Sequence, residues 1–332
     1  MMKINEEEEI MKKILSALLV LLLALVPFGA ATLAEETIDS TVTIVVPFAA
    51  GGTSDILARI LSPHLSEILG QDVIVENKPG AGGNLGADVV AHANPNGTTL
   101  LLMDVGTLAI SPSLYELTYD PQTDLAPVSM LAFTPYILAV SPNLPVTTFE
   151  ELVAYSQENP GKVNVAHSGV GAGNHLTELV LNEELGLDWK IVAYSGGSEA
   201  IRAVVSGECD VILNGAAATL PYVVQDQLKG LAVTGGSRLA DLPDMPTFAE
   251  LGLPESEGGS WQGLLATAGT PESIITQLNE AIAQVVEIEE VRDNILNLGA
   301  EVSTGTPEDL DAWIDENVTR WAEVIEANNI SL

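Results

Sequence analysis

The chain opens its folded part with an apolar run, a glycine-rich turn and a helix with one apolar face. Residues 42–46 are apolar and typical of a buried strand, residues 47–55 are mostly small, and residues 54–69 have apolar positions at helical spacing. A turn of this kind exposes backbone N–H groups and the positive end of a helix dipole, so it favours an anion. An ordinary βα turn without a ligand fits the segment equally well.

The same order of strand, glycine-rich turn and helix occurs three more times. The later turns lie at residues 78–86, 168–174 and 195–198. Ligands of open α/β sheets bind beyond the carboxyl ends of the strands, where such turns lie. We therefore expect the four turns to face one cleft and to clamp an anion between two lobes.

The remaining pattern alternates strands with helices and predicts an α/β fold with open, mostly parallel sheets. Further strands are expected at 73–76, 100–103, 137–140, 162–166, 191–194, 210–213 and 231–233, and further helices at 89–91, 150–158, 176–185, 199–206, 273–298 and 307–327.

Residues 1–34 have the pattern of a secretory signal peptide. From Met11 onward, two lysines precede a run of thirteen residues that is apolar except for Ser16, and small residues lead to cleavage after Ala31 or Ala34. We expect Met11 to be the true start. The apolar run is shorter than the roughly twenty residues of a membrane-spanning helix. No cysteine lies at or near the expected cleavage sites, so an N-terminal lipid anchor is not expected.

The composition narrows the possible partners. The formal net charge is −34 and 47% of the residues are hydrophobic, so the chain should fold rather than remain disordered. Its negative field should repel nucleic acids and anionic membranes. The one cysteine, Cys209, cannot form an internal disulfide and is expected to be a buried structural residue.

The motifs of common enzyme classes are missing. The sequence holds no G-x-S-x-G, no complete dinucleotide fingerprint and no phosphate loop. Its four histidines do not have the spacing of a metal site. His167 and Ser168 are neighbours, and adjacent strand residues point to opposite faces. We therefore expect no catalytic residue, no metal ligand and no cofactor.

Several blocks of sequence together resemble one receptor family over essentially the whole mature chain. The blocks are 47–55 with Arg59, 76–84, 119–121 with 124–127, 242–250 and 261–264. On these residues the chain is similar to the tripartite tricarboxylate transporter substrate-binding receptors, also called the Bordetella uptake gene family.

The resemblance implies a two-lobed, type II periplasmic-binding-protein-like fold with a hinge. It assigns residues 38–138 plus 255–332 to lobe 1 and residues 139–254 to lobe 2. It further implies a monomeric periplasmic receptor that closes over a di- or tricarboxylate and delivers it to the membrane permease subunits of the transporter.

The resemblance also implies a set of ligand-binding residues. One carboxylate would meet the first turn through Phe48, Ala50, Gly51 and Gly52, with Asp55 organising water, and Asn84 lies in the matching second turn. The far carboxylate would lie near Ser168, Gly171, Asn174, Tyr194, Ser195 and Asp210. The chain departs from the family here: it has Ser195 where a lysine is often found and Asn174 where a serine or threonine is common.

Two other functions stay open at this point. The same binding fold could present its ligand to a membrane kinase, as a sensory receptor. A secreted enzyme acting on organic acids would need a nucleophile–base pair or a metal cluster, and the sequence offers neither. The sequence does not say which acid is bound or whether a cation accompanies it.

Overall fold

A computed structural model describes Met11 and residues 37–253, 258–327 and 330–331. The expected signal peptide therefore lies outside the described residues, apart from Met11. None of the helices within these ranges is both long and apolar enough to cross a bilayer.

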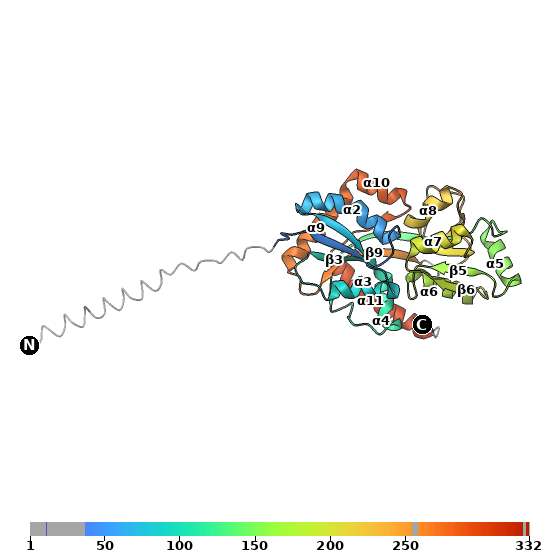
Figure 1. Cartoon of the computed structure of the whole chain (residues 1–332), viewed down its shortest axis with the longest axis horizontal. Coiled ribbons are helices and arrows are strands. Elements are labelled where there is room, and N and C mark those ends of the chain that lie inside the picture. Colours follow the sequence, from blue (N-terminus) through green and yellow to red (C-terminus); the bar gives the residue numbers. More distant parts are fainter. Residues whose placement is uncertain (1–10, 12–36, 254–257, 328–329, 332) are drawn as a thin grey trace, which may run out of the picture. The chain divides into compact units, whose positions relative to one another are not determined.

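The described chain alternates strands and helices as the pattern predicts (Figure 1). The strands are β1 Val42–Val46, β2 Val73–Asn77, β3 Thr99–Asp104, β4 Leu125–Val140, β5 Asn164–His167, β6 Lys190–Ala193, β7 Val211–Gly215, β8 Lys229–Val233, β9 Gly259–Thr267 and β10 Glu301–Val302. The helices are α2 Thr53–Leu69, the 3₁₀ turn η1 Ala81–Gly83, α3 Asn84–Ala91, α4 Val105–Leu114, α5 Phe149–Glu158, α6 Gly173–Glu184, α7 Gly197–Ser206, α8 Ala216–Val224, α9 Glu272–Glu287, α10 Glu289–Asn297 and α11 Pro307–Ala327.

The strands are ordered β2-β1-β3-β9-β4-β7-β5-β6, with β8 and β10 also paired to β4. The outer strands are parallel: β1 pairs with β2 and β3, and β5 pairs with β6 and β7. The two central strands, β4 and β9, run antiparallel to their neighbours. The predicted α/β class is confirmed, and the antiparallel centre is a feature that the sequence pattern did not indicate.

Strand β4 joins the two lobes. Its first part pairs with β9 as far as Pro135↔Gly259, and its last part, from Tyr136, pairs with β7. The hydrophobic cores divide at the same place. One core gathers residues from 38–132 and 264–314, and two others gather residues from 136–248. In this article lobe 1 holds the first core and lobe 2 holds the other two.

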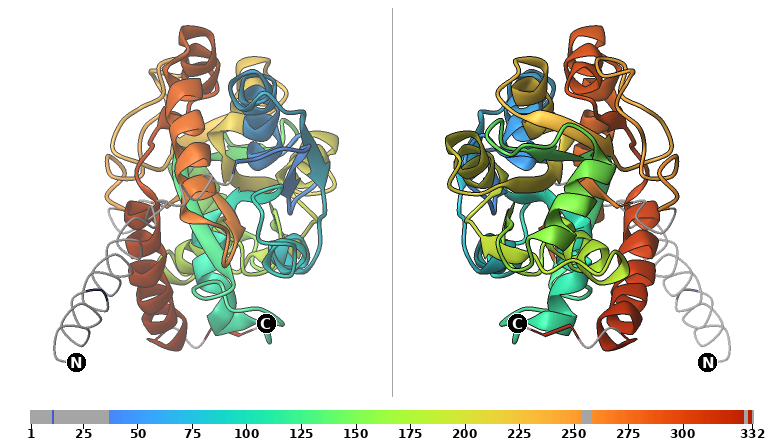
Figure 2. Two further views of the ribbon diagram at one scale, coloured as in Figure 1. Left: turned by 90° about the vertical axis from the view of Figure 1, so that its left-hand side faces the viewer. Right: turned by 90° about the vertical axis from the view of Figure 1, so that its right-hand side faces the viewer.

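The lobes are also linked away from the strands. A small cluster combines Ile110 of α4, Leu176 of α6 and Ile325 of α11. Helix α11, drawn in red, lies beside α4 in both views of Figure 2. Through the cluster, these two helices of lobe 1 meet α6, the first helix after the third glycine-rich turn.

Helix α2 shows how the sequence sets the local structure. Its buried positions include Leu57, Leu61 and Leu65, which recur at helical spacing and face the core. It ends at Gly70, whose φ of 66° lies in the left-handed region that glycine adopts at low cost. The predicted helix at 273–298 is wrong in one respect: the chain is extended at Ile288 (φ −66°, ψ 120°), which separates α9 from α10.

Candidate functional site

The first and fourth glycine-rich turns meet across the two lobes. The Ser198 hydroxyl donates a hydrogen bond to the Ala50 carbonyl at 2.7 Å. A Cβ atom on Gly196 would lie only 2.8 Å from the Ala49 nitrogen. The two turns thus touch through backbone, and only glycine at position 196 allows the lobes to approach this closely.

The second and third turns meet in the same way. The Tyr115 hydroxyl donates to the Val170 carbonyl at 2.5 Å, and a Cβ atom on Gly82 would lie 2.4 Å from that carbonyl oxygen. The Gly173 amide donates to the Thr107 hydroxyl at 3.3 Å. The four turns therefore form two pairs across the cleft, and this structure has the lobes closed.

A cavity lies between the closed lobes. Its empty volume is about 420 Å³, including the part open to solvent. It is lined by Phe48, Gly52, Thr53, Ser54, Asp104, Thr107, Tyr136, Ser168, Asn174, Gly197, Asn214, Gly215, Ser260 and Gln262. None of these residues is a lysine, an arginine or a histidine.

Three helices begin at the cavity without a side-chain cap. Helices α2, α7 and α8 follow Gly52, Gly196 and Gly215, and no side chain of the described residues caps their first amides. The first N–H groups of a helix lack intrahelical partners, and they carry the positive end of its dipole. Lobe 1 contributes α2 and lobe 2 contributes the other two, so the cavity presents hydrogen-bond donors suited to an anion from both sides.

The cavity lining also includes a buried carboxylate, Asp104. One of its oxygens accepts from the Gly106 amide at 2.9 Å and so caps α4. The other accepts from the Ser260 hydroxyl at 2.9 Å and from the Tyr136 hydroxyl at 3.4 Å. Burial raises the pKa of Asp104 to about 6, because these hydrogen bonds offset only part of the lost hydration.

Four of the predicted site residues line the cavity: Phe48, Gly52, Ser168 and Asn174. The Ser168 hydroxyl donates to the Asn174 side-chain oxygen at 2.9 Å, and the Asn174 amide group donates to the Leu213 carbonyl at 2.9 Å. The third turn and the edge of β7 are thereby fixed to each other.

Three further predicted residues support the first turn from outside the cavity. Ala50 receives the hydrogen bond from Ser198, and the Gly51 amide donates to the Asp55 carboxylate at 2.8 Å. Asp55 also accepts from Arg59 at 3.0 Å and from the Asn77 side chain at 2.9 Å. Burial alone would raise the pKa of Asp55, but these hydrogen bonds outweigh it and hold the pKa below its usual value.

We expect Asp55→Ala to weaken ligand binding about tenfold while the protein still unfolds cooperatively. The substitution leaves the Gly51 amide and the Asn77 side chain without their buried partner, which costs about 1–3 kcal/mol. Calorimetric titration checks this, with the exposed Asp72→Ala as the matched control. An affinity equal to that of the unmodified protein would remove Asp55 from the account of the site.

The other predicted residues lie away from the lining. Asn84 is buried and holds the second turn, since it donates to the Ala81 carbonyl and accepts from the Tyr119 hydroxyl. The Gly171 amide donates to a ring nitrogen of His175 within lobe 2.

Tyr194, Ser195 and Asp210 also lie outside the cavity lining. The hydroxyls of Tyr194 and Ser195 donate to Glu208 and Glu199. Asp210 directly precedes β7 and accepts from the Asn164 amide, at the amino-terminal edge of the parallel strands. The cavity lies beyond the other edge of these strands.

Sequence reasoning did not name the other ten of the fourteen lining residues, including Asp104, Tyr136, Asn214, Ser260 and Gln262. One signal was available for Asp104, because an aspartate directly after the apolar residues 100–103 lies at the carboxyl end of a predicted strand. The other four lie on β4, β7 and β9, whose pairing is set by contacts between distant segments.

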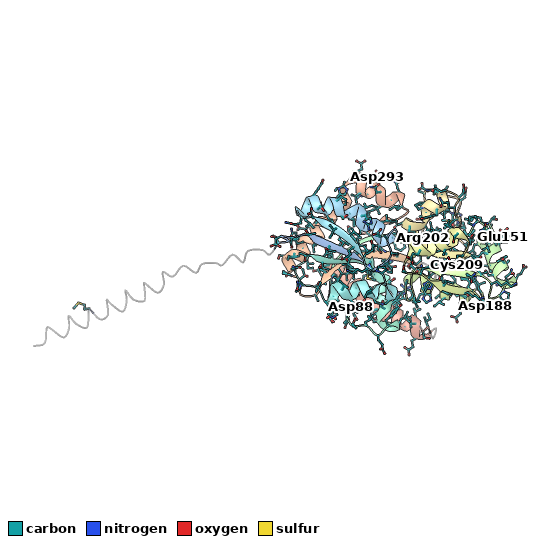
Figure 3. All side chains as sticks on the ribbon, viewed as in Figure 1. Asp88, Glu151, Asp188, Arg202, Cys209 and Asp293 are labelled. Atoms are coloured by element: carbon teal, nitrogen blue, oxygen red, sulfur yellow. The ribbon has the colours of Figure 1, made fainter. Side chains whose placement is uncertain are left out.

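The side chains that suggested chemistry have structural roles. The rings of His167 and His175 stack 4.3 Å apart, and burial lowers their pKa values to about 3 and 4. Ser168 donates to Asn174, so no histidine acts as its base. Cys209 is buried, and the Arg202 side chain on α7 is 61% exposed (Figure 3). Within the described residues, no group of three His, Cys, Asp or Glu side chains could hold a metal ion.

Comparison with known proteins identifies the family. The profile described as "Tripartite tricarboxylate transporter family receptor" matches residues 57–330. The chain belongs to this receptor family. It is 33% identical to the periplasmic binding protein BugD, with a TM-score of 0.85 over 89% of this chain and 100% of BugD.

Two related structures contain ligands. The Rpa4515 protein of R. palustris with adipate is 32% identical to this chain, with a TM-score of 0.84 over 88% of this chain and 99% of that one. MatC from Rhodopseudomonas palustris with bound malate is 35% identical, with a TM-score of 0.82 over 86% and 99%. These relatives confirm the two-lobed fold and place the chain among solute-binding receptors rather than enzymes.

Proposed function

We propose that this chain is an extracytoplasmic receptor that captures a small di- or tricarboxylate between its lobes and delivers it to a tripartite tricarboxylate-type permease. The observation that carries the proposal is the cavity at which α2, α7 and α8 begin. Its amides come from both lobes, so an acid that contacts all three helices favours the closed state over the open one.

An acidic protein can bind an acid by this means. The amides act at hydrogen-bond distance, where they replace the water that a carboxylate loses. The carboxylates at the surface, such as Glu151, Asp188 and Asp293 (Figure 3), are exposed. Their fields are screened beyond about 8 Å at physiological salt. The net charge of −34 therefore does not prevent anion binding.

We further propose that the two lobes rotate about two connections, which puts the first lobe boundary three residues before the expected one at 138–139. One is the part of β4 where the chain leaves β9 and joins β7, between Pro135 and Tyr136. The other is the start of β9 at Gly259. Both connections lie in or next to strands, and a hinge needs only a few residues to absorb the change in backbone angles.

The relatives support the ligand class and the location. Two of them hold the dicarboxylates adipate and malate, and BugD is a periplasmic binding protein. We propose a periplasmic location reached through the predicted signal peptide at residues 1–34, and a monomer that docks on the permease subunits.

A thermal-shift screen tests the proposed ligand class. The purified protein is heated with citrate, succinate, L-malate, L-aspartate, L-glutamate and aromatic acids, each in large excess. A ligand that binds only the folded state raises the melting temperature by mass action. We expect at least one di- or tricarboxylate to raise it by several degrees. A screen in which no carboxylate changes the melting temperature would contradict the proposal.

A further inference from the structure

Asp104 and Gln262 lie side by side on one wall of the cavity. They are directly opposite each other in the antiparallel pair of β3 and β9, so their side chains share one face of the sheet. Ser260, two residues before Gln262, lies on the same face. All three residues line the cavity, and all are more than nine-tenths buried.

Hydrogen bonds fix the orientation of the Gln262 side chain. The Ser260 hydroxyl has a single hydrogen, which it donates to Asp104 at 2.9 Å. It must therefore accept from the Gln262 nitrogen, which lies 2.5 Å away. The Gln262 oxygen is then directed away from Ser260, and it is buried with no hydrogen-bond partner among the described residues. A buried acceptor of this kind costs about 1–3 kcal/mol unless something donates to it.

The Asp104 carboxylate also lacks a counter-charge. The cavity lining contains no lysine, arginine or histidine, and the ion pairs of the described residues do not include Asp104. A buried charge of this kind is stabilised by an opposite charge with hydrogens to donate. The second carboxylate of a simple dicarboxylate would be repelled if it lay next to Asp104.

We propose that the ligand is an acidic amino acid, whose ammonium group contacts Asp104 and the Gln262 oxygen while a carboxylate contacts the starts of α2, α7 and α8. This inference rests on the proposed function and names the class of acid. An ammonium group has three hydrogens and a positive charge, so it can satisfy both acceptors and neutralise Asp104. A hydroxyl group has one hydrogen and no charge, so it leaves one acceptor unpaired.

Acids that differ at a single position test the assignment. L-aspartate, L-malate and succinate share two carboxylates and carry an ammonium, a hydroxyl and a hydrogen at the same carbon. L-glutamate, L-2-hydroxyglutarate and glutarate form the same series with one more carbon. Calorimetric titration at pH 7.5 gives the affinities. One of the two series is expected to bind more tightly than the other. In that series, the amino acid should bind at least tenfold more tightly than the unsubstituted acid (succinate or glutarate), and the hydroxy acid should have an intermediate affinity.

Two substitutions locate the effect. Asp104→Asn keeps the shape and removes the charge, and Gln262→Leu removes the free acceptor. Each should reduce the ratio of amino-acid to plain-acid affinity at least tenfold, whereas the exposed control Asp241→Asn should leave it unchanged. If a variant fails to fold, the order in which the unmodified protein binds the six acids still tests the inference. Equal or tighter binding of succinate or glutarate would overturn the inference while supporting a carboxylate receptor. No binding by any of the six acids would also overturn the inference, and the thermal-shift screen would then decide the proposed function.

Discussion

Gly196→Ala should weaken ligand binding by about five- to one-hundred-and-fifty-fold. Gly196 has an extended backbone (φ 168°) that alanine can adopt, so the free lobe is not strained. In the closed state, however, the new methyl group would lie 2.8 Å from the Ala49 nitrogen and 3.1 Å from its Cβ atom. Overpacking of this kind costs about 1–3 kcal/mol, and it falls on the closed state alone.

The measurement for this variant combines calorimetry with small-angle X-ray scattering. Gly196 is not part of the cavity lining, so a loss of affinity reports on closure. We expect the scattering radius of Gly196→Ala to respond less to ligand than that of the unmodified protein. Gly236→Ala is the matched control, because a Cβ atom there would meet nothing within 4 Å. Full affinity in Gly196→Ala would mean that the first and fourth turns do not meet in the bound state.

Glu178→Gln should stabilise the protein, and more so as the pH rises. Glu178 is completely buried on α6, and neither of its oxygens has a hydrogen-bond partner among the described residues. Burial raises its pKa well above the usual value of 4.5, and the nearby Leu213 amide lowers the pKa by less than burial raises it. The native state therefore keeps a proton that the unfolded state releases above about pH 4.5. With fewer protons on the unfolded chain, stability falls by about 1.4 kcal/mol per pH unit until the raised native pKa is reached.

Urea unfolding at pH 5.5 and pH 7.5 measures this difference. The stability of Glu178→Gln relative to the unmodified protein should be greater at pH 7.5 than at pH 5.5, because only the unmodified protein has to keep or lose a buried proton over this range. Glu184→Gln, an exposed substitution on the same helix with the same change of charge, should show no such increase. A constant difference between Glu178→Gln and the unmodified protein would show that Glu178 is ionised in the native state.

The local elements could be predicted from the sequence wherever one helix face or one short strand carries the pattern. Helix α2, strand β1 and the long helix α11 follow directly from apolar spacing and flanking glycine or proline. Helices α4 and α8 were not predicted, because each is apolar on several sides and contains a proline, Pro112 or Pro221. Neither sequence shows the single apolar stripe of an amphipathic helix.

The long strand β4 was missed for a similar reason. Proline is unfavourable within a central strand, and the run contains Pro127 and Pro135. The structure accommodates Pro127 beside a shift in register between Pro127 and Ser129, where the ladder is interrupted. A single-sequence pattern does not reveal a bulge of this kind, so only the last residues of β4 were expected.

The candidate site was likewise predicted only in part. The glycine-rich turns are local signals, and they lie at the cleft as expected. The wall that carries Asp104 is assembled from β3 and β9, and Asp104 and Ser260 are 156 positions apart in the chain. Their contact depends on the strand order β3-β9-β4, which the spacing of residues within each strand does not determine.

The crystal structure of the complex with the acid that binds most tightly tests the central claim most directly. We predict a ligand carboxylate within hydrogen-bond distance of amides in the first turn of α2 and of α7 or α8, with both lobes contributing. A carboxylate held by lysine or arginine side chains, or an acid bound outside the cavity between the lobes, would contradict the account.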